Sequence, residues 1–389
     1  MSVSYWSEKN LQKKQISCDI CVVGAGISGL STAYWLNQED PNLKIVILEK
    51  KQVGSGATSR NAGFITCGSV EHFNRMVSKH GEKTALEIWR FAEGNMNLLK
   101  SKIFNQNSKQ HSFKQEGAFS LAAKDAELSE LRQVAQLMSS HNIPVEEINA
   151  DAVSKRLGAT GFVGGIKYLK DGEVDPMELL SDIQKNVNAE IIENAEVFRV
   201  DTGALGQRKV ISSLVDVDCT LVVYCCNGYS QSLDNYFTDK IYPTRGQIMV
   251  LAPVKPFMEG PCYANFYLDY FRQLKDGSLL VGGFRQLESD TEKGFSDHTT
   301  EKIQQALHDF VTTHLPQFTK SPVTHRWAGV MGFSSDGEPM VGSLPTDNQI
   351  FFCGGFTGHG IGLAFNTGKA LVDLIFDRPI PDWLSAKRF

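Results

Sequence analysis

The sequence predicts an α/β protein whose first domain is assembled from discontinuous segments and whose second, α+β domain carries a mixed or antiparallel sheet. Two observations predict the first domain: an apolar strand, a glycine-rich loop and a helix follow one another at 19–36 and again at 350–376. A third observation predicts the second sheet, because residues 248–283 are rich in Tyr, Phe, Val and Leu with alternating character. The expected boundaries are 1–84, 150–240 and 326–389 for the first domain, and 85–149 and 241–325 for the second.

The N-terminal unit has the spacing of a dinucleotide-binding motif. The apolar run at 19–23 predicts a buried parallel strand, and three spaced glycines follow it. Gly24 allows a tight turn, Gly26 lets a pyrophosphate approach the backbone, and Gly29 lets the helix pack closely on the strand. The start of that helix offers free N–H groups to phosphate charge. Placed between two apolar strands, the motif predicts a bound dinucleotide.

An acidic residue supports this interpretation. Glu49 closes the second apolar strand, Ile45–Leu48, and stands 20 residues after Gly29. At that position a carboxylate accepts hydrogen bonds from ribose hydroxyls and repels a 2′-phosphate, so we do not expect NADP.

The remaining elements follow from periodicity. Apolar residues recur at helical spacing over 85–103 and 128–138, on either side of a strand-like 117–121, and we expect this insertion to lie away from the nucleotide fold. Asp175 and Pro176 begin a further helix, and another is expected at 300–314.

Composition excludes several classes of function. The chain has 389 residues and a net charge of −5, and this lack of basic surplus argues against nucleic acid as a partner. The polar first 15 residues predict no secretory signal, and the apolar runs are too short to span a membrane. Eight cysteines include a Cys18–Cys21 pair, which at the start of a strand is expected to be buried rather than to bind a metal. We therefore expect a cytoplasmic protein without a metal site.

The C-terminal glycine-rich loop, 354–360, reads GGFTGHG and precedes a helix. An enzyme that only binds NAD needs no second unit of strand, glycine-rich loop and helix, whereas a flavin enzyme does. Reduction places negative charge on the N1–C2=O edge of the flavin, and a helix N-terminus stabilises that charge. His359 is either a catalytic base or a residue that holds the loop and offers its backbone N–H.

Besides the two glycine-rich loops, at 24–29 and 354–360, the chain has the sequences SRNAG at 59–63 and DYFR at 269–272. In these four segments it resembles the D-amino acid oxidase/glycine oxidase family of FAD enzymes. Within that family the chain looks most like the γ-glutamylputrescine oxidase-type amine oxidases. The resemblance implies a Rossmann-like FAD-binding domain and a substrate domain whose mixed sheet covers the isoalloxazine.

The resemblance also implies site residues. Those expected to act in catalysis or to position the substrate are Tyr270, His359 and Arg60. Those expected to contact FAD are Gly24, Gly26, Ile27, Ser28, Gly29, Glu49, Lys50, Ser59, Arg60, Asn61, Ala62, Val197, Asn227, Gly228, Gly329, Gly358, His359, Gly360 and Ile361.

Two departures from the family bear on the substrate and the oxidant. Glycine oxidases place a carboxylate-binding arginine just after a Trp-Ala-Gly, where this chain has Met331. Amines without a nearby carboxylate therefore become more plausible, although Arg285 is an alternative cation. Sarcosine oxidases attach flavin to a cysteine and use a lysine to activate oxygen, and Leu280 stands near the position of that lysine. We therefore expect noncovalent FAD, with O2 or another electron acceptor.

The expected reaction is oxidation of a primary or secondary amine to an imine by hydride transfer to flavin N5, followed by hydrolysis. The amine must lose its ammonium proton, and an aromatic pocket favours the neutral form. The aromatic residues expected in that pocket are Tyr263, Phe266, Tyr267, Tyr270 and Phe271. The alternatives are a D-amino acid or glycine oxidase or dehydrogenase, and a noncatalytic flavin-binding redox protein. The sequence identifies neither the amine nor the oligomeric state.

Overall fold

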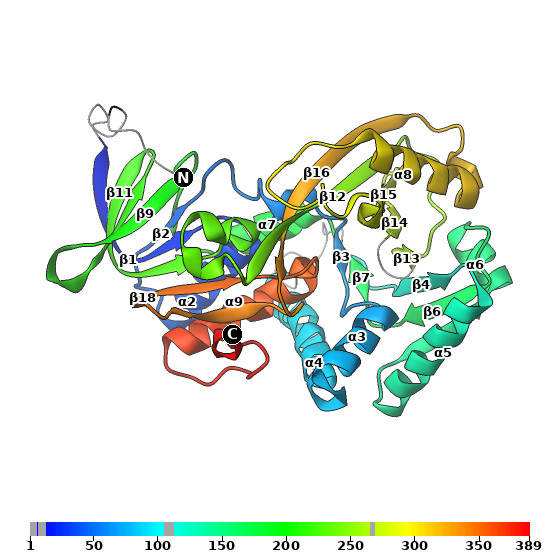
Figure 1. Cartoon of the computed structure of the whole chain (residues 1–389), viewed down its shortest axis with the longest axis horizontal. Coiled ribbons are helices and arrows are strands. Elements are labelled where there is room, and N and C mark those ends of the chain that lie inside the picture. Colours follow the sequence, from blue (N-terminus) through cyan, green and yellow to red (C-terminus); the bar gives the residue numbers. More distant parts are fainter. Residues whose placement is uncertain (1–5, 7–12, 105–112, 265–268) are drawn as a thin grey trace.

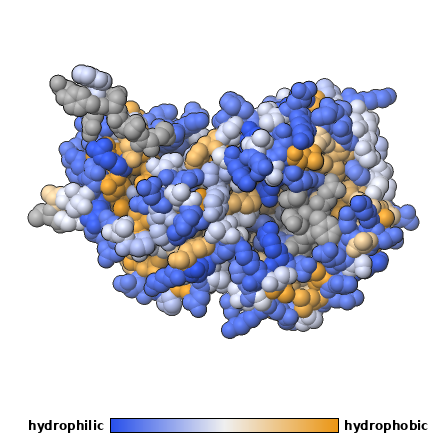
Figure 2. Space-filling view, in the orientation of Figure 1, coloured by the Kyte–Doolittle hydropathy of each residue, from blue (hydrophilic) through white to orange (hydrophobic). Residues whose placement is uncertain are grey.

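A computed structural model describes residues 6, 13–104, 113–264 and 269–389. It contains two large mixed sheets, which lie side by side along the long axis of the molecule (Figure 1). The expected aromatic residues Phe266 and Tyr267 lie outside the described residues. On the face drawn in Figure 2, hydrophilic residues cover most of the surface and apolar residues are scattered among them. Within the described ranges, no helix combines the length and apolarity that crossing a membrane requires.

The first sheet has the strand order β17-β18-β11-β1-β2-β8, with β10 and β9 added beside β11. Its strands are β1 (Lys14–Val23), β2 (Ile45–Leu48), β8 (Glu190–Ile192), β9 (Val197–Thr202), β10 (Arg208–Ser212), β11 (Val215–Tyr224), β17 (Met340–Leu344) and β18 (Asp347–Gly354). Strands β2, β1, β11 and β18 are parallel neighbours, so their carboxyl ends meet at one edge. Cys18 and Cys21 are buried in β1 as expected, and all eight cysteines are free.

Two helices from opposite ends of the chain pack together beside this sheet, α2 (Ile27–Glu39) and α9 (Gly360–Ile375) (Figure 1). The indole nitrogen of Trp35 donates to the carbonyl of Phe365 at 2.9 Å. A Cβ at Gly368 would lie 3.0 Å from Ser31, so this glycine sets the close approach of the two helices. The predicted return of the C-terminal unit to the N-terminal one is therefore confirmed.

The expectation that residues 85–103 lie away from the nucleotide fold is wrong. Helix α4 (Glu82–Leu98) packs against α9. The buried Asn95 donates to the carbonyl of Ile361 at 3.2 Å and accepts from the N–H of Asn366 at 2.9 Å. Helical periodicity shows which face of α4 is buried, but it does not show which element covers that face.

The second sheet has the order β16-β12-β15-β14-β13-β4-β6-β5. Its strands are β4 (Ala118–Ala122), β5 (Val145–Asn149), β6 (Gly164–Tyr168), β12 (Ile241–Leu251), β13 (Cys262–Ala264), β14 (Asp269–Gln273), β15 (Leu279–Gly282) and β16 (Val323–Ser334). All neighbours are antiparallel except β13 and β4, so the predicted mixed sheet is present. Strands β6 and β16 belong to this sheet, although the expected boundaries assigned 150–240 and 326–389 to the other domain.

Short elements join the two sheets. Strands β3 (Phe64–Ile65) and β7 (Gly172–Glu173) form a two-stranded ladder between them (Figure 1). Within the described residues, the other α-helices are α3 (Val70–His80), α5 (Asp125–Ser140), α6 (Ala150–Leu157), α7 (Pro176–Lys185) and α8 (Glu301–His314). The predicted start of α7 is confirmed, because the Asp175 carboxylate accepts from the N–H groups of Met177 and Glu178.

Candidate active site

A cavity of about 750 Å³ is lined by loops of the first sheet and by strands of the second. This volume is within the range of small-molecule and cofactor sites. The cavity-lining residues among the expected cofactor contacts are Gly24, Gly26, Ile27, Ser28, Glu49, Lys50, Arg60, Asn61, Ala62, Val197, Asn227, Gly228, Gly329, Gly358, His359, Gly360 and Ile361. Gly29 and Ser59 do not line it.

The N-terminal glycines shape one helix end at this cavity. Gly24 has a φ of +104°, a conformation that L side chains rarely adopt. A Cβ at Gly29 would stand 1.9 Å from the carbonyl oxygen of Gly24, so Gly29 permits helix–strand packing rather than touching a ligand. The N-cap of α2, Gly26, makes no side-chain capping bond. In the first turn, the N–H of Ile27 donates to the hydroxyl of Thr58 at 3.0 Å, so an anion would be bound by the N–H groups that follow it.

The C-terminal loop presents a second helix end to the same cavity. The side-chain oxygen of Asn227 accepts from the N–H of Gly355 at 3.0 Å and from that of Phe356 at 3.5 Å, which fixes the loop. The N-cap of α9, His359, makes no side-chain capping bond either. A Cβ at Gly56 or Gly358 would meet no atom within 4 Å, so backbone faces open space at both positions. Two helix N-termini and bare backbone at one cavity fit a dinucleotide such as FAD.

Glu49 is held in place at the end of β2. One carboxylate oxygen accepts from the N–H of Ala25 at 2.8 Å, and the other accepts from the N–H of Lys51 at 3.0 Å. A carboxylate has about four lone-pair sites, so this one retains acceptor capacity for ribose hydroxyls. Beside it, Lys50 pairs with Glu196 at 2.9 Å.

The loop at 57–63 fastens the two sheets together. Arg60 donates to the carbonyl of Ala328 on β16 at 2.6 Å, and a Cβ at Gly329 would lie 2.7 Å from the Cβ of Arg60. Asn61 donates to the carbonyls of Ala57 and Thr58, so its side chain is engaged within the loop. The N–H of Ser59 donates to the Gly54 carbonyl.

A histidine that no sequence motif marks lies beside His359. The two imidazoles of His72 and His359 are stacked, with centroids 4.0 Å apart and an interplanar angle of 16°. Nδ1 of His359 lies 3.1 Å from the carbonyl oxygen of Thr357 and donates to it, which leaves Nε2 as an acceptor. Burial, with Arg75 and Arg285 nearby, lowers the pKa of His359 to about 4. The ring is therefore neutral at pH 7.

His72 is buried on α3 and also lines the cavity. Neither of its ring nitrogens has a hydrogen-bond partner among the described residues, and burial lowers the pKa of this ring as well. No motif surrounds His72. Its one local signal is Ser69, the N-cap of α3, whose hydroxyl accepts the His72 N–H at 3.2 Å.

Aromatic side chains form the wall on the second sheet. Phe64 packs edge-on against Tyr263 and Tyr270, at centroid distances of 5.1 and 5.8 Å. The hydroxyl of Tyr263 lies 2.8 Å from that of Thr66, and burial raises the pKa of Tyr270 to about 12. The expectation that Phe271 joins this wall is wrong. Because side chains alternate along β14, Phe271 is fully buried on the opposite face of the sheet.

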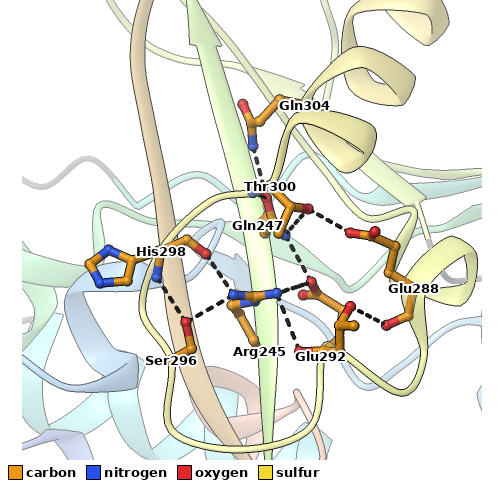
Figure 3. A network of polar contacts seen from close by, with 9 residues as sticks. Arg245, Gln247, Glu288, Glu292, Ser296, His298, Thr300 and Gln304 are labelled. Carbon is orange, nitrogen blue, oxygen red and sulfur yellow. Dashed lines mark hydrogen bonds and ion pairs between the residues drawn. The ribbon is translucent and has the colours of Figure 1, made fainter.

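The segment after β15 is fastened to β12 by a buried ion pair (Figure 3). Arg245 donates through Nε and Nη2 to one carboxylate oxygen of Glu292, at 3.1 and 2.6 Å. It also donates to the hydroxyl of Ser296 and to the carbonyl of His298. Gln247 donates to the same Glu292 oxygen at 2.9 Å. These bonds hold in place the segment that carries three cavity-lining residues, Arg285, Phe295 and Asp297.

Replacing Glu292 by Gln is expected to lower the free energy of unfolding by about 3 kcal/mol, because a buried guanidinium loses its counter-charge. Urea titration measures this loss. Asp290→Asn is the matched control, since its ion pair with Lys293 is exposed, and it is expected to cost less than about 0.5 kcal/mol. Equal effects of the two substitutions would contradict a stabilising role for the buried pair.

Replacing Glu49 by Ala is expected to weaken FAD binding about tenfold or more, because charge-assisted hydrogen bonds to the ribose are lost. The FAD retained after dialysis, measured from visible absorbance, tests this. Glu193→Ala is the control, since Glu193 also accepts a loop N–H, from Val53 at 2.7 Å, but does not line the cavity. If both variants retain FAD equally, Glu49 does not hold the ribose.

Known proteins share this fold and sequence pattern. The family model described as DAO, FAD dependent oxidoreductase, matches residues 19–374. Glycine oxidase from Bacillus subtilis strain 168 is 26% identical over 388 residues, covering 94% of this chain and 95% of the relative. Gamma-glutamylputrescine oxidoreductase from Escherichia coli strain K12 is 22% identical over 390 residues, covering 93% and 84%.

The likeness extends to solved structures. The crystal structure of glycine oxidase from Geobacillus kaustophilus matches with a TM-score of 0.80 at 19% identity, covering 94% of this chain and 96% of that one. The family match includes both glycine-rich loops and Glu49, and FAD is accordingly the cofactor. The chain belongs to the DAO family of FAD-dependent oxidoreductases.

Proposed function

We propose that this enzyme oxidises a primary or secondary amine to an imine, which water then hydrolyses. The observation that supports the proposal is the lining of the cavity, which includes the aromatic rings of Tyr263 and Tyr270, the neutral imidazoles of His72 and His359, and Met331. Met331 lies on β16, and its terminal methyl would be 2.8 Å from a Cβ at Gly246. By the resemblance to glycine oxidases, this is the position of the arginine that binds an α-carboxylate, so an apolar side chain here supports an amine without a nearby carboxylate.

The chain's own residues favour a neutral amine. An aromatic and apolar enclosure lowers the pKa of a bound ammonium, because burial disfavours its charge. Nε2 of His359 is an unprotonated acceptor aligned by the Thr357 carbonyl, and we assign it the amine N–H as partner. A pKa of about 4 makes this ring a weak base, so it orients the amine rather than retaining its proton.

The remaining roles follow from the two helix N-termini. They would hold FAD noncovalently, with the pyrophosphate at α2 and the flavin edge at Gly358–Ile361, and Arg60 and Asn227 would keep the flanking loops in register. When bound, the flavin supplies the chemistry by accepting the hydride. We propose that O2 or another acceptor completes the cycle, and that the enzyme works in the cytoplasm, where its thiols remain reduced.

A second candidate function is oxidation of an α-amino acid, as the names of the glycine oxidase relatives suggest. One observation favours it: Arg285 lines the cavity close enough to Tyr270 to affect the pKa of the phenol. Arg285 would then bind the α-carboxylate, the role that glycine oxidases give to an arginine at the position of Met331.

Anaerobic mixing of the FAD-loaded protein with a substrate panel is expected to bleach the flavin with 1-aminobutane or its N-methyl derivative, and more slowly with glycine or D-alanine. Stopped-flow absorbance measures the rate and the apparent Kd. Bleaching by glycine or D-alanine alone would support the second candidate instead. A flavin that no amine or amino acid bleaches would contradict both and favour a noncatalytic flavoprotein.

Replacing Tyr270 by Phe is expected to reduce the ratio of reduction rate to Kd about fivefold, because one neutral hydrogen bond to the substrate is lost. Tyr168→Phe is the control, since its hydroxyl bonds Ser120 at 2.8 Å away from the cavity. An unchanged ratio in the Tyr270 variant would show that this phenol is only part of the packed wall.

A further inference from the structure

The imidazole of His359 needs more than its hydrogen bond to be held in one orientation. Its Nδ1 donates to the Thr357 carbonyl at 3.1 Å, which fixes one atom of the ring. The torsion that turns a histidine ring about its Cβ–Cγ bond has only a broad energy preference, so packing must set the ring plane. The chain neighbours of His359 are Gly358 and Gly360, which have no side chain to pack against it. Because the Nε2 lone pair lies in the ring plane, its direction depends on a contact from another element.

That contact comes from His72 on α3. The two rings stack with centroids 4.0 Å apart and an angle of 16° between their planes, so a flat face covers one side of the His359 ring. An aromatic pair favours particular relative orientations of its two rings. The stack and the Thr357 hydrogen bond together therefore determine where Nε2 of His359 points.

The backbone at the start of α3 holds the His72 ring in turn. The N–H of His72 donates to the hydroxyl of Ser69, the N-cap of the helix, at 3.2 Å. Gly68 has a φ of +123°, and a Cβ at this position would lie 2.3 Å from Nδ1 of His72. The His72 ring therefore occupies space that the Cβ of any other residue at 68 would fill. The helix cap and the bare glycine fix His72 without any ligand.

The ring nitrogens of His72 offer nothing to a substrate. Both are buried, and neither has a hydrogen-bond partner among the described residues. A buried polar atom without a partner costs free energy, so this histidine is unfavourable as a simple packing residue. His72 lines the cavity but presents no accessible hydrogen-bonding atom there. Its effect on a substrate must pass through the ring of His359, on which it is stacked.

We propose that His72 is a positioning residue, whose ring face holds the imidazole of His359 so that Nε2 points at the amine of the substrate. This inference rests on the proposed function, in which Nε2 accepts the amine N–H. It gives a task to a histidine whose burial is otherwise unfavourable. A side chain of similar bulk without a flat face would fill the same space but would leave the orientation of His359 unfixed.

Two substitutions separate the ring face from the filling of space. His72→Phe keeps a flat ring, whereas His72→Leu keeps apolar bulk without one. NMR of the oxidised, FAD-loaded protein, labelled at its histidine ring nitrogens, reports at pH 7 which nitrogen of His359 carries the proton. His359→Asn identifies the signals of that ring. The unsubstituted protein and His72→Phe are expected to show one tautomer, with the proton on Nδ1, and His72→Leu a mixture of the two tautomers.

Anaerobic reduction of the flavin by 1-aminobutane measures the contact with the substrate. In His72→Leu the ratio of reduction rate to Kd is expected to fall about fivefold, because the neutral hydrogen bond between the amine and Nε2 is lost. In His72→Phe the ratio is expected to stay within about twofold of that of the unsubstituted protein. Visible absorbance gives the FAD content of each variant, and the rates are expressed per bound flavin.

His314→Leu is the matched control. His314 on α8 also packs against aromatic rings, those of Phe162 and Phe310, each at a centroid distance of 4.7 Å, but it does not line the cavity. Its substitution is expected to change neither the tautomer of His359 nor the reduction of the flavin. Any change of either kind would show that a loss of aromatic packing anywhere in the chain has the same effect, and would overturn the inference.

The remaining outcomes distinguish this inference from the proposed function. Equal results for His72→Phe and His72→Leu in either measurement would overturn the inference and leave amine oxidation intact. A mixture of tautomers in His72→Leu with an unchanged reduction ratio would also overturn it, because the orientation of His359 would then not matter to the substrate. If no amine reduces the flavin, the proposed function fails, and the NMR measurement still decides whether His72 fixes the ring of His359.

Discussion

The parallel alignment of β1, β11 and β18 is the constraint on which the rest of the structure depends. Val23 is paired with Tyr224, and Tyr224 with Phe352, so the three strands are aligned where β1 and β11 end, and β18 continues to Gly354. Each strand is followed at that edge by a loop of the cavity wall, and two of these loops open a helix. Residues more than 300 positions apart therefore meet at one site. Without this register, the two glycine-rich loops would not lie at one cavity and could not bind the same dinucleotide.

The two sheets contribute to the cavity by different means. The first sheet supplies mainly backbone, in the form of two helix N-termini and bare glycines. It adds one side chain, the carboxylate of Glu49, which its own loop holds in place. The second sheet and the segments attached to it supply side chains, including Tyr263, Tyr270, Met331 and Arg285. Backbone contacts suit a cofactor that every family member binds, whereas side chains are free to differ between relatives with different substrates. The Arg245–Glu292 pair belongs to the second group, because it positions a segment that reaches over the cavity.

The sequence predicted those parts of the fold that local chemistry determines. The glycine-rich loops, the Asp175 cap of α7 and the aromatic strands at 248–283 each carry their own signal, and the structure confirms them. Tertiary packing determined the rest. Periodicity leaves open which element covers α4, and no local pattern marks the stacking of His72 on His359. Phe271 is different, because strand alternation alone places it on the face opposite Tyr270.

The central claim is that both chain ends hold one FAD molecule, with its flavin facing the aromatic wall. A crystal structure of the FAD-loaded protein tests it most directly. The account predicts adenosine beside Glu49 and Val197, pyrophosphate at the start of α2, and the flavin between Tyr270 and the start of α9. Density that places the flavin away from residues 358–361, or FAD bound outside this cavity, would contradict the account.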